Sequence, residues 1–259
     1  MSSSSWDVVQ VDELSEDVLD ALFANEVGGV RIANFTSADD CRAVSKAVVS
    51  NGFDFYETLD PPLGRIGIAQ YDHRGDKAEY VRQAAIAHGT RKRIFAESVD
   101  PIPQVLDALT AAWPAKVGLA AEDAYGDYFA GIVRITVGGI KVHCDWAQHD
   151  APGWLVGTVT SQLVWNLYYD LTEHGGETTV YQRPSTPDME SFAEGAFGFY
   201  RPDAVEDCER YVVSPQRGDV ILFNSRNAHA VAPATGSGVR ISASSFVGRM
   251  PDNSLILWS

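Results

Sequence analysis

The sequence is poor in cysteine and in long apolar runs. Its three cysteines, Cys41, Cys144 and Cys208, are widely spaced and form no CxxC pair, which indicates reduced thiols rather than a disulfide framework. No apolar run approaches the roughly 18 residues that a membrane span requires. The residues after Met1 lack the basic and apolar regions of a secretory signal peptide. We therefore expect a cytoplasmic protein that does not cross a membrane.

Positive charge is also scarce. The chain has 20 Lys and Arg against 35 Asp and Glu, a formal net charge of −15. Proteins that bind nucleic-acid phosphates carry clustered Lys and Arg, so we expect no nucleic-acid partner. An acidic surface serves solubility and by itself points to no particular partner. The composition leaves the oligomeric state open.

Helical patterns dominate the first 120 of the 259 residues. Capping residues and apolar periodicity predict helices from about 37 to 52, from 76 to 96, and from Pro101 to Pro114. Residues 53–75 are rich in turn-forming residues, and such a long irregular segment in a compact protein is typical of a functional lid.

Strand-like patterns dominate the remainder. In 158–170 the alternation places Leu163 and Trp165 on one face, and Gln162 and Asn166 on the other. The predicted strands are 128–137, 140–143, 158–170, 178–182, 220–223, 230–232 and 240–247. Helices followed by many strands predict an α+β fold in a single domain, 1–259. That domain would be a β-sandwich or barrel buttressed by N-terminal helices.

Two histidines and a carboxylate form a candidate metal site. His143 and Asp145 are two residues apart, so on a strand they point to the same face, and His229 follows after a short buried strand. Two imidazoles and one carboxylate form the facial triad of non-haem iron, which leaves positions open for other ligands. A His-x-Asp pair alone is usually a surface feature or a turn. The same ligands also suit zinc in a hydrolase, although the sequence has no His-Glu-x-x-His helix.

A candidate anion clamp follows the second histidine. Arg240 and Ser242 share one face of a predicted strand. An arginine and a serine placed in this way can hold a carboxylate by charge-assisted hydrogen bonds. Taken alone, Arg240 is better explained by an ordinary salt bridge on an exposed strand face. Its place after both histidines favours the clamp.

Taken together, these positions resemble the signature of the Fe(II)/2-oxoglutarate-dependent oxygenases, over about residues 128–248. Wider stretches look like one branch, the freestanding amino-acid and alkaloid hydroxylases and halogenases. These stretches begin at Pro61 (PPLGRIGI), Tyr128 (YFAGIVR), His143 (HCDW), Phe223 (FNSRNAH) and Ser245 (SFVG). The resemblance implies a double-stranded β-helix, or jelly-roll, core over about 121–259. Residues 1–120 would then supply mainly helical support and the lid.

The resemblance also implies ligands and roles. His143, Asp145 and His229 would hold Fe(II), and no catalytic side chain is expected beyond them. Arg240 and Ser242 would bind the far carboxylate of 2-oxoglutarate, with Arg134 as a further ligand of this cosubstrate, and O2 would be the oxidant. Candidate substrate contacts are Arg65 in the lid and Trp165 on the long strand.

The implied reaction is hydroxylation of an unactivated C–H bond in a small molecule, a free amino acid or related metabolite, with succinate and CO2 as co-products. Halogenases of this branch carry Gly or Ala where this chain has Asp145, which vacates a coordination position for chloride. Asp145 therefore favours hydroxylation or desaturation over chlorination. A non-catalytic jelly-roll binding protein is the remaining alternative.

Overall fold

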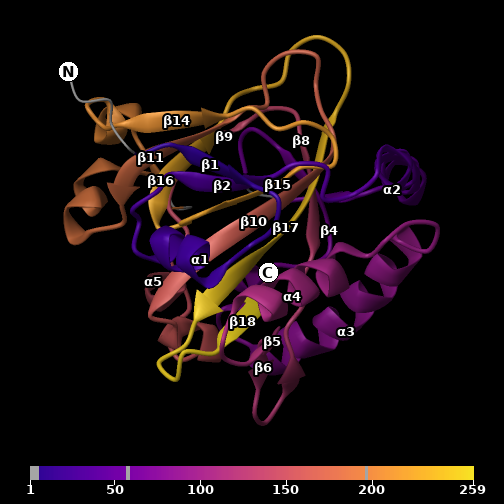
Figure 1. The fold of residues 1–259 in the computed structure, drawn as a ribbon, viewed down its shortest axis with the longest axis horizontal. Coiled ribbons are helices and arrows are strands. Elements are labelled where there is room, and N and C mark those ends of the chain that lie inside the picture. Colours follow the sequence, from indigo (N-terminus) through magenta and orange to yellow (C-terminus); the bar gives the residue numbers. More distant parts are fainter. Residues whose placement is uncertain (1–5, 57–58, 196–197) are drawn as a thin grey trace.

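The computed structural model describes residues 6–56, 59–195 and 198–259, which form two large β-sheets with helices packed outside (Figure 1). The longer helices are α1 Glu16–Phe23, α2 Ala38–Asn51, α3 Lys77–Ile94 and α4 Pro101–Ala112. The short ones are η1 Gln70–His73, α5 Ala147–Asp150, η2 Leu155–Thr158, η3 Pro187–Phe192 and η4 Pro202–Val205.

The larger sheet has ten strands. In spatial order they are β1 Val8–Val11, β2 Gly29–Ile32, β15 Val220–Phe223, β10 Ser161–Asp170, β17 Arg240–Arg249, β8 Ile132–Thr136, β4 Leu63–Ile66 and β3 Asp54–Phe55; β18 Leu255–Trp258 pairs with β17, and β5 Val117–Leu119 with β18.

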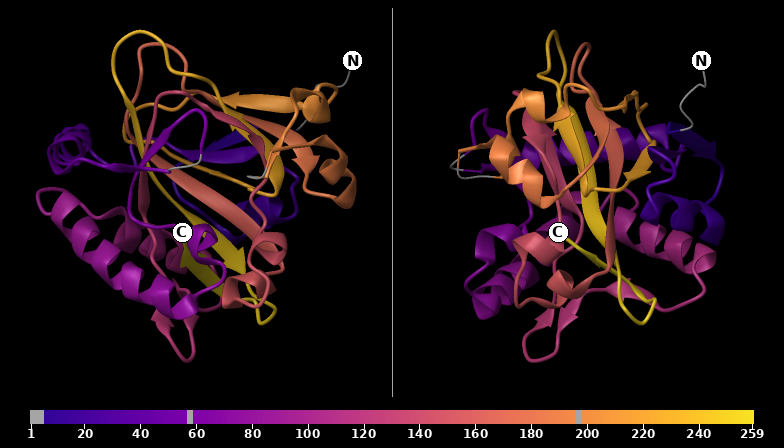
Figure 2. Two further views of the ribbon diagram at one scale, coloured as in Figure 1. Left: turned by 180° about the vertical axis from the view of Figure 1, so that it is seen from behind. Right: turned by 90° about the vertical axis from the view of Figure 1, so that its left-hand side faces the viewer.

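The smaller sheet has six strands. They are β12 Ala193–Glu194, β13 Phe199–Tyr200, β9 Ile140–His143, β16 Asn227–Val231, β11 Thr178–Pro184 and β14 Arg210–Val213. A separate two-stranded ribbon joins β6 Ala121–Glu122 to β7 Gly126–Asp127. Figure 2 shows the ribbon of these strands from two further directions. Strands of both large sheets line one shared pocket, so the inner faces of the two sheets enclose the candidate site.

The three predicted helices after residue 36 are confirmed, and their caps explain where they begin. The Ser37 hydroxyl accepts a hydrogen bond from the Asp40 amide at 3.1 Å, and the Asp76 carboxylate accepts one from Glu79 at 2.9 Å. Such caps each stabilise a helix by about 1 kcal/mol. Helix α2 ends at Gly52, whose φ of +71° suits glycine.

The N-terminal part adds strands to the larger sheet. Alternation over residues 30–35 predicts a strand there, and β2 confirms it by pairing antiparallel with β15. Strand β4, which pairs with β8, was not predicted. Residues 63–66 were expected within the irregular lid but form β4. Its four residues carry no clear alternation, and its hydrogen bonds come from a strand about 70 residues away in sequence. Glu57 and Thr58, also in the predicted lid, lie outside the described residues.

Strand β10 separates the hydrophobic core from the pocket. Its residues Leu163, Trp165 and Leu167 pack into the core beneath α1, α2 and α4. The alternate residues, including Gln162 and Asn166, line the pocket. The predicted division of this strand into two faces is therefore confirmed. In the described part of the chain, no helix combines the length and apolar character needed to cross a membrane.

Candidate active site

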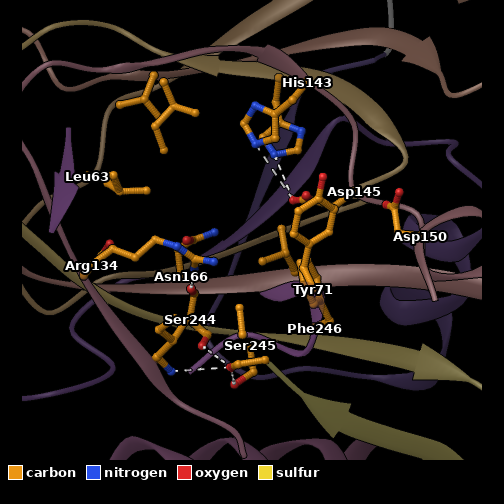
Figure 3. A pocket seen from close by; sticks show the side chains of 18 of the residues that line it. Leu63, Tyr71, Arg134, His143, Asp145, Asp150, Asn166, Ser244, Ser245 and Phe246 are labelled. Carbon is orange, nitrogen blue, oxygen red and sulfur yellow. Dashed lines mark hydrogen bonds and ion pairs between the residues drawn. The ribbon is translucent and has the colours of Figure 1, made fainter. Parts of the chain in front are cut away.

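The two candidate histidine ligands lie on neighbouring strands of the smaller sheet. His143 on β9 and His229 on β16 are direct cross-strand partners, so their side chains share the inner face. Their ring centroids are 4.1 Å apart. The Asp145 carboxylate oxygen Oδ2 lies 3.4 Å from His229 Nε2 and 3.9 Å from His143 Nε2 (Figure 3). The structure thus brings the predicted triad together, with all three ligand atoms within 4.8 Å of one another.

Backbone contacts orient both imidazoles for metal binding. Nδ1 of His143 lies 2.8 Å from the Lys141 carbonyl, and Nδ1 of His229 lies 2.8 Å from the Asn227 carbonyl. A carbonyl oxygen only accepts hydrogen bonds, so each Nδ1 carries the proton and each Nε2 presents a lone pair. Both Nε2 atoms face Asp145. This arrangement is typical of histidine ligands whose orientation is fixed by a second hydrogen bond.

The charge states at neutral pH also suit a divalent cation. Burial, reinforced by the nearby His229, lowers the pKa of His143 to about 4, so its imidazole is neutral. Burial raises the pKa of Asp145, but its contacts with His229 and His143 outweigh burial and lower that pKa to about 2. The cluster therefore offers a neutral imidazole at His143, an ionised carboxylate at Asp145, and the Nε2 atom of His229 beside them.

Gln162 on β10 anchors the loop that carries Asp145. Its side-chain amide donates to the Asp145 carbonyl at 3.2 Å and to the Ser225 hydroxyl at 3.1 Å, and its oxygen accepts from the Ala147 amide at 2.9 Å. The Asp145 amide in turn donates to the Ser225 carbonyl at 2.9 Å. The sequence carries no signal for this role of Gln162, because only the fold brings β10 beside this loop.

Arg240 lies at the other end of the pocket, in a cradle of hydroxyl groups. It is only 4 % exposed. Its guanidinium donates to Thr136 at 3.2 Å, to Ser242 at 3.4 Å and to Thr178 at 3.3 Å, and lies 5.1 Å from the centre of the Tyr168 ring. Within the described residues it has no carboxylate partner, and its Nε is buried without a hydrogen bond. A buried, uncompensated arginine of this kind is prepared for an anion.

Arg134 on β8 also points into the pocket but has different neighbours. Its guanidinium donates to the Ser244 hydroxyl, and Ser244 is the cross-strand partner of Asn166. Figure 3 shows these three side chains together beside the metal-ligand cluster. Arg134 makes no hydrogen bond to the three hydroxyls around Arg240 among the described contacts.

The two predicted substrate contacts lie outside this cluster. Arg65 is on β4 beside Arg134, but it forms an ion pair with Asp72 and stacks over Tyr56, 4.1 Å from the ring centre. Asp72 and Tyr56 line the pocket, which places Arg65 just behind its wall. Trp165 is fully buried in the helix-side core, so the prediction of a substrate contact is wrong for this residue. The alternation along β10 predicts two faces but does not indicate which of them lines the pocket.

Comparison with known proteins identifies the family. The sequence model of one protein family, the carrier-protein-independent halogenase WelO5 family, matches residues 5–259, and the chain belongs to this family. Leucinostatins biosynthesis cluster protein S of Purpureocillium lilacinum is 33% identical over 221 residues, covering 80% of this chain and 90% of that protein. The L-gamma-glutamyl-L-propargylglycine hydroxylase of Streptantibioticus cattleyicolor is 29% identical over 271 residues, 99% of this chain and 97% of that protein.

A solved structure shares the fold. The N-substituted L-amino acid dioxygenase of Burkholderia ambifaria aligns with a TM-score of 0.64 at 18% identity, covering 94% of this chain and 91% of that one. The predicted membership of the iron- and 2-oxoglutarate-dependent oxygenases is therefore confirmed, and the chain is an enzyme of that class.

Proposed function

We propose that this enzyme hydroxylates an unactivated C–H bond of a small, amino-acid-like molecule, using Fe(II), 2-oxoglutarate and O2. The observation that carries the proposal is the complete ligand set, two imidazole Nε2 atoms and the Asp145 carboxylate gathered on one wall of the pocket. Bound Fe(II) and 2-oxoglutarate would supply the oxidising chemistry, coupled to formation of succinate and CO2. The protein would position the reactants and exclude water.

Arg240 is the proposed site for the far carboxylate of 2-oxoglutarate. A charge-assisted fork from the guanidinium, with hydroxyls from Thr136, Thr178 and Ser242 around it, suits an anionic carboxylate oxygen pair. The absence of any described carboxylate beside this buried cation supports the assignment. Ser242 was predicted for this role, whereas the two threonines were not.

Asp145 favours hydroxylation over chlorination within a family whose model is named for a halogenase. Its carboxylate already faces both imidazoles, so it would occupy the coordination position that a bound chloride needs. A hydroxylase is among the relatives that match along nearly the whole chain. We propose that the inserted group is therefore oxygen rather than halide.

The names of the relatives support an amino-acid-like substrate. One relative acts as a hydroxylase on L-gamma-glutamyl-L-propargylglycine, and the similar solved structure is a dioxygenase of N-substituted L-amino acids. We also propose that the two facing sheets form a double-stranded β-helix. The shared pocket between their inner faces supports this description.

Anaerobic absorption spectroscopy tests the proposal. Addition of Fe(II) and then 2-oxoglutarate to the metal-free protein should produce a weak visible charge-transfer band from the chelated cosubstrate. Asp145→Ala and Arg240→Ala should each weaken or abolish the band. Arg82→Gln, which removes a charge from an exposed helix position, is the matched control and should leave it unchanged. If the parent gives no band, the proposed function is wrong.

Product analysis then decides between oxygenation and halogenation. With O2, chloride and a panel of amino acids and gamma-glutamyl dipeptides, we expect a product heavier by one oxygen atom, formed together with succinate. A chlorinated main product would contradict the role given to Asp145, and loss of two hydrogens would indicate desaturation.

A further inference from the structure

We propose that Arg134, with Ser244 and Asn166, binds a carboxylate group of the substrate and so selects carboxylate-bearing molecules. The inference rests on the proposed function and assigns Arg134 to the substrate, where the sequence prediction assigned it to 2-oxoglutarate. Three observations carry it: Arg134 has no ion-pair partner, the acidic groups of the pocket have other partners, and polar groups surround the guanidinium.

Arg134 differs from its arginine neighbour in having no counter-charge. On the adjacent strand, Arg65 is its direct cross-strand partner and is neutralised by Asp72. Within the described residues Arg134 forms no ion pair, and its guanidinium donates a hydrogen bond to the neutral Ser244 hydroxyl. An arginine held in a half-buried pocket without an anion is stabilised when a carboxylate reaches it.

The acidic groups that line the pocket do not pair with Arg134. Asp72 is paired with Arg65, and Asp150 lies 3.5 Å from Arg74. The carboxyl group of Ser259 also lines the pocket, but its hydrogen bonds come from the Gln70 amide at 2.8 Å and the Tyr80 hydroxyl at 3.2 Å, and it forms no ion pair with Arg134 in the described structure. Arg134 is therefore left to pair with a carboxylate of the substrate.

The surroundings of Arg134 separate it from the cosubstrate cradle. The Arg240 guanidinium already has three hydroxyl partners, and the opposite end of 2-oxoglutarate would be held by the metal. Arg134 turns to Ser244, two residues further along β17 than the cradle residue Ser242. It therefore offers an anion site distinct from the one at Arg240.

Asn166 completes this second anion site. It is half-buried, lines the pocket, and makes no side-chain hydrogen bond to any described residue. Figure 3 shows its side chain beside the Arg134 guanidinium. A carboxylate can accept two hydrogen bonds from the arginine fork and a further one from an amide NH2 group. The three side chains thus match the bonding capacity of one carboxylate.

The test compares acids with their neutral amides. L-Amino acids and gamma-glutamyl dipeptides, each as free acid and as C-terminal carboxamide, are added to the Fe(II)–2-oxoglutarate complex. Their binding is followed by the change in the charge-transfer band and by succinate release. In the parent, acids should act at concentrations at least about 30-fold lower than amides, as expected for loss of one partner of a buried charge pair.

Variants locate the selectivity. Arg134→Gln should raise the half-effective concentration of the best acid at least about 30-fold, and Arg134→Lys by less, because lysine keeps the charge but lacks the fork. Neither should change the half-saturating 2-oxoglutarate concentration more than about threefold, roughly 0.7 kcal/mol. A retained charge-transfer band shows that the variant is folded. Arg82→Gln is again the control.

Three results would overturn the inference. In the first, amides bind as well as acids. In the second, every acid in the panel leaves both signals unchanged. In the third, Arg134→Gln weakens the binding of 2-oxoglutarate and leaves the binding of the best acid unchanged. The last result would return Arg134 to the cosubstrate. A parent that gives no charge-transfer band would instead overturn the proposed function itself, so the two failures are distinguishable.

Discussion

Replacing Gln162 by leucine removes an amide that joins the loop carrying Asp145 to Ser225, which lies between β15 and β16. Leucine has a similar volume, so the cost comes from the polar groups that lose a partner. The Ala147 amide loses its acceptor, which costs about 1–3 kcal/mol of unfolding free energy for a buried donor. The Asp145 carbonyl keeps a hydrogen bond from the Ser225 hydroxyl at 3.2 Å, so its loss is smaller.

The same change should weaken metal binding. Groups that orient a ligand typically change metal affinity by about 10- to 100-fold when removed, and we expect Gln162→Leu to fall within this range. Urea unfolding of the metal-free protein measures the stability loss. Anaerobic titration with Fe(II) in the presence of 2-oxoglutarate, followed by the charge-transfer band, measures the affinity.

A glutamine close by in the chain provides the control. The Gln148 side chain on α5 donates one hydrogen bond to the Val159 carbonyl at 2.6 Å and makes none to the ligand loop in the described structure. Gln148→Leu should bind Fe(II) within about threefold of the parent, roughly 0.7 kcal/mol. If Gln162→Leu also binds Fe(II) like the parent, Gln162 contributes to folding but does not position Asp145, and the reasoning fails.

Three further changes test the fold and its charges. Asp219→Ala, which removes a 1 % exposed carboxylate paired with Arg31 at 2.7 Å, should lower the unfolding free energy by about 3–5 kcal/mol in a urea titration. Gly139→Ala should cost at least about 1–2 kcal/mol in the same assay, because φ is +81° and a Cβ would meet the Val231 carbonyl at 2.5 Å. The metal-free protein should lose stability as the pH falls from about 6.5 to 4, because His143 becomes protonated in the unfolded chain at a higher pH than in the folded one. The loss is at most about 3 kcal/mol. An unfolding free energy from urea titrations that stays constant over this pH range would contradict the prediction.

The sequence alone determined much of the candidate site. His143 and Asp145, His229, and Arg240 with Ser242 appear in a recognisable order, and the structure brings the three candidate metal ligands together. The helices after residue 36 were also predictable, because Ser37, Asp76 and Asp100 cap them through contacts within three residues. Both kinds of signal are local, or follow the order of the chain.

Only the tertiary structure decided which residues complete the site. Thr136 and Thr178 reach Arg240 from different sheets, and Gln162 reaches the ligand loop from β10. Pairing of β4 with β8 made part of the predicted lid a strand. Pairing of β10 with β15 and β17 placed Trp165 in the core. Along a strand, successive side chains point to opposite faces, and the sequence shows this alternation. Whether a given face packs against the core or lines the pocket depends on pairing between strands that are far apart in sequence. That pairing carries no local signal, so the sequence could supply the ligands but not their surroundings.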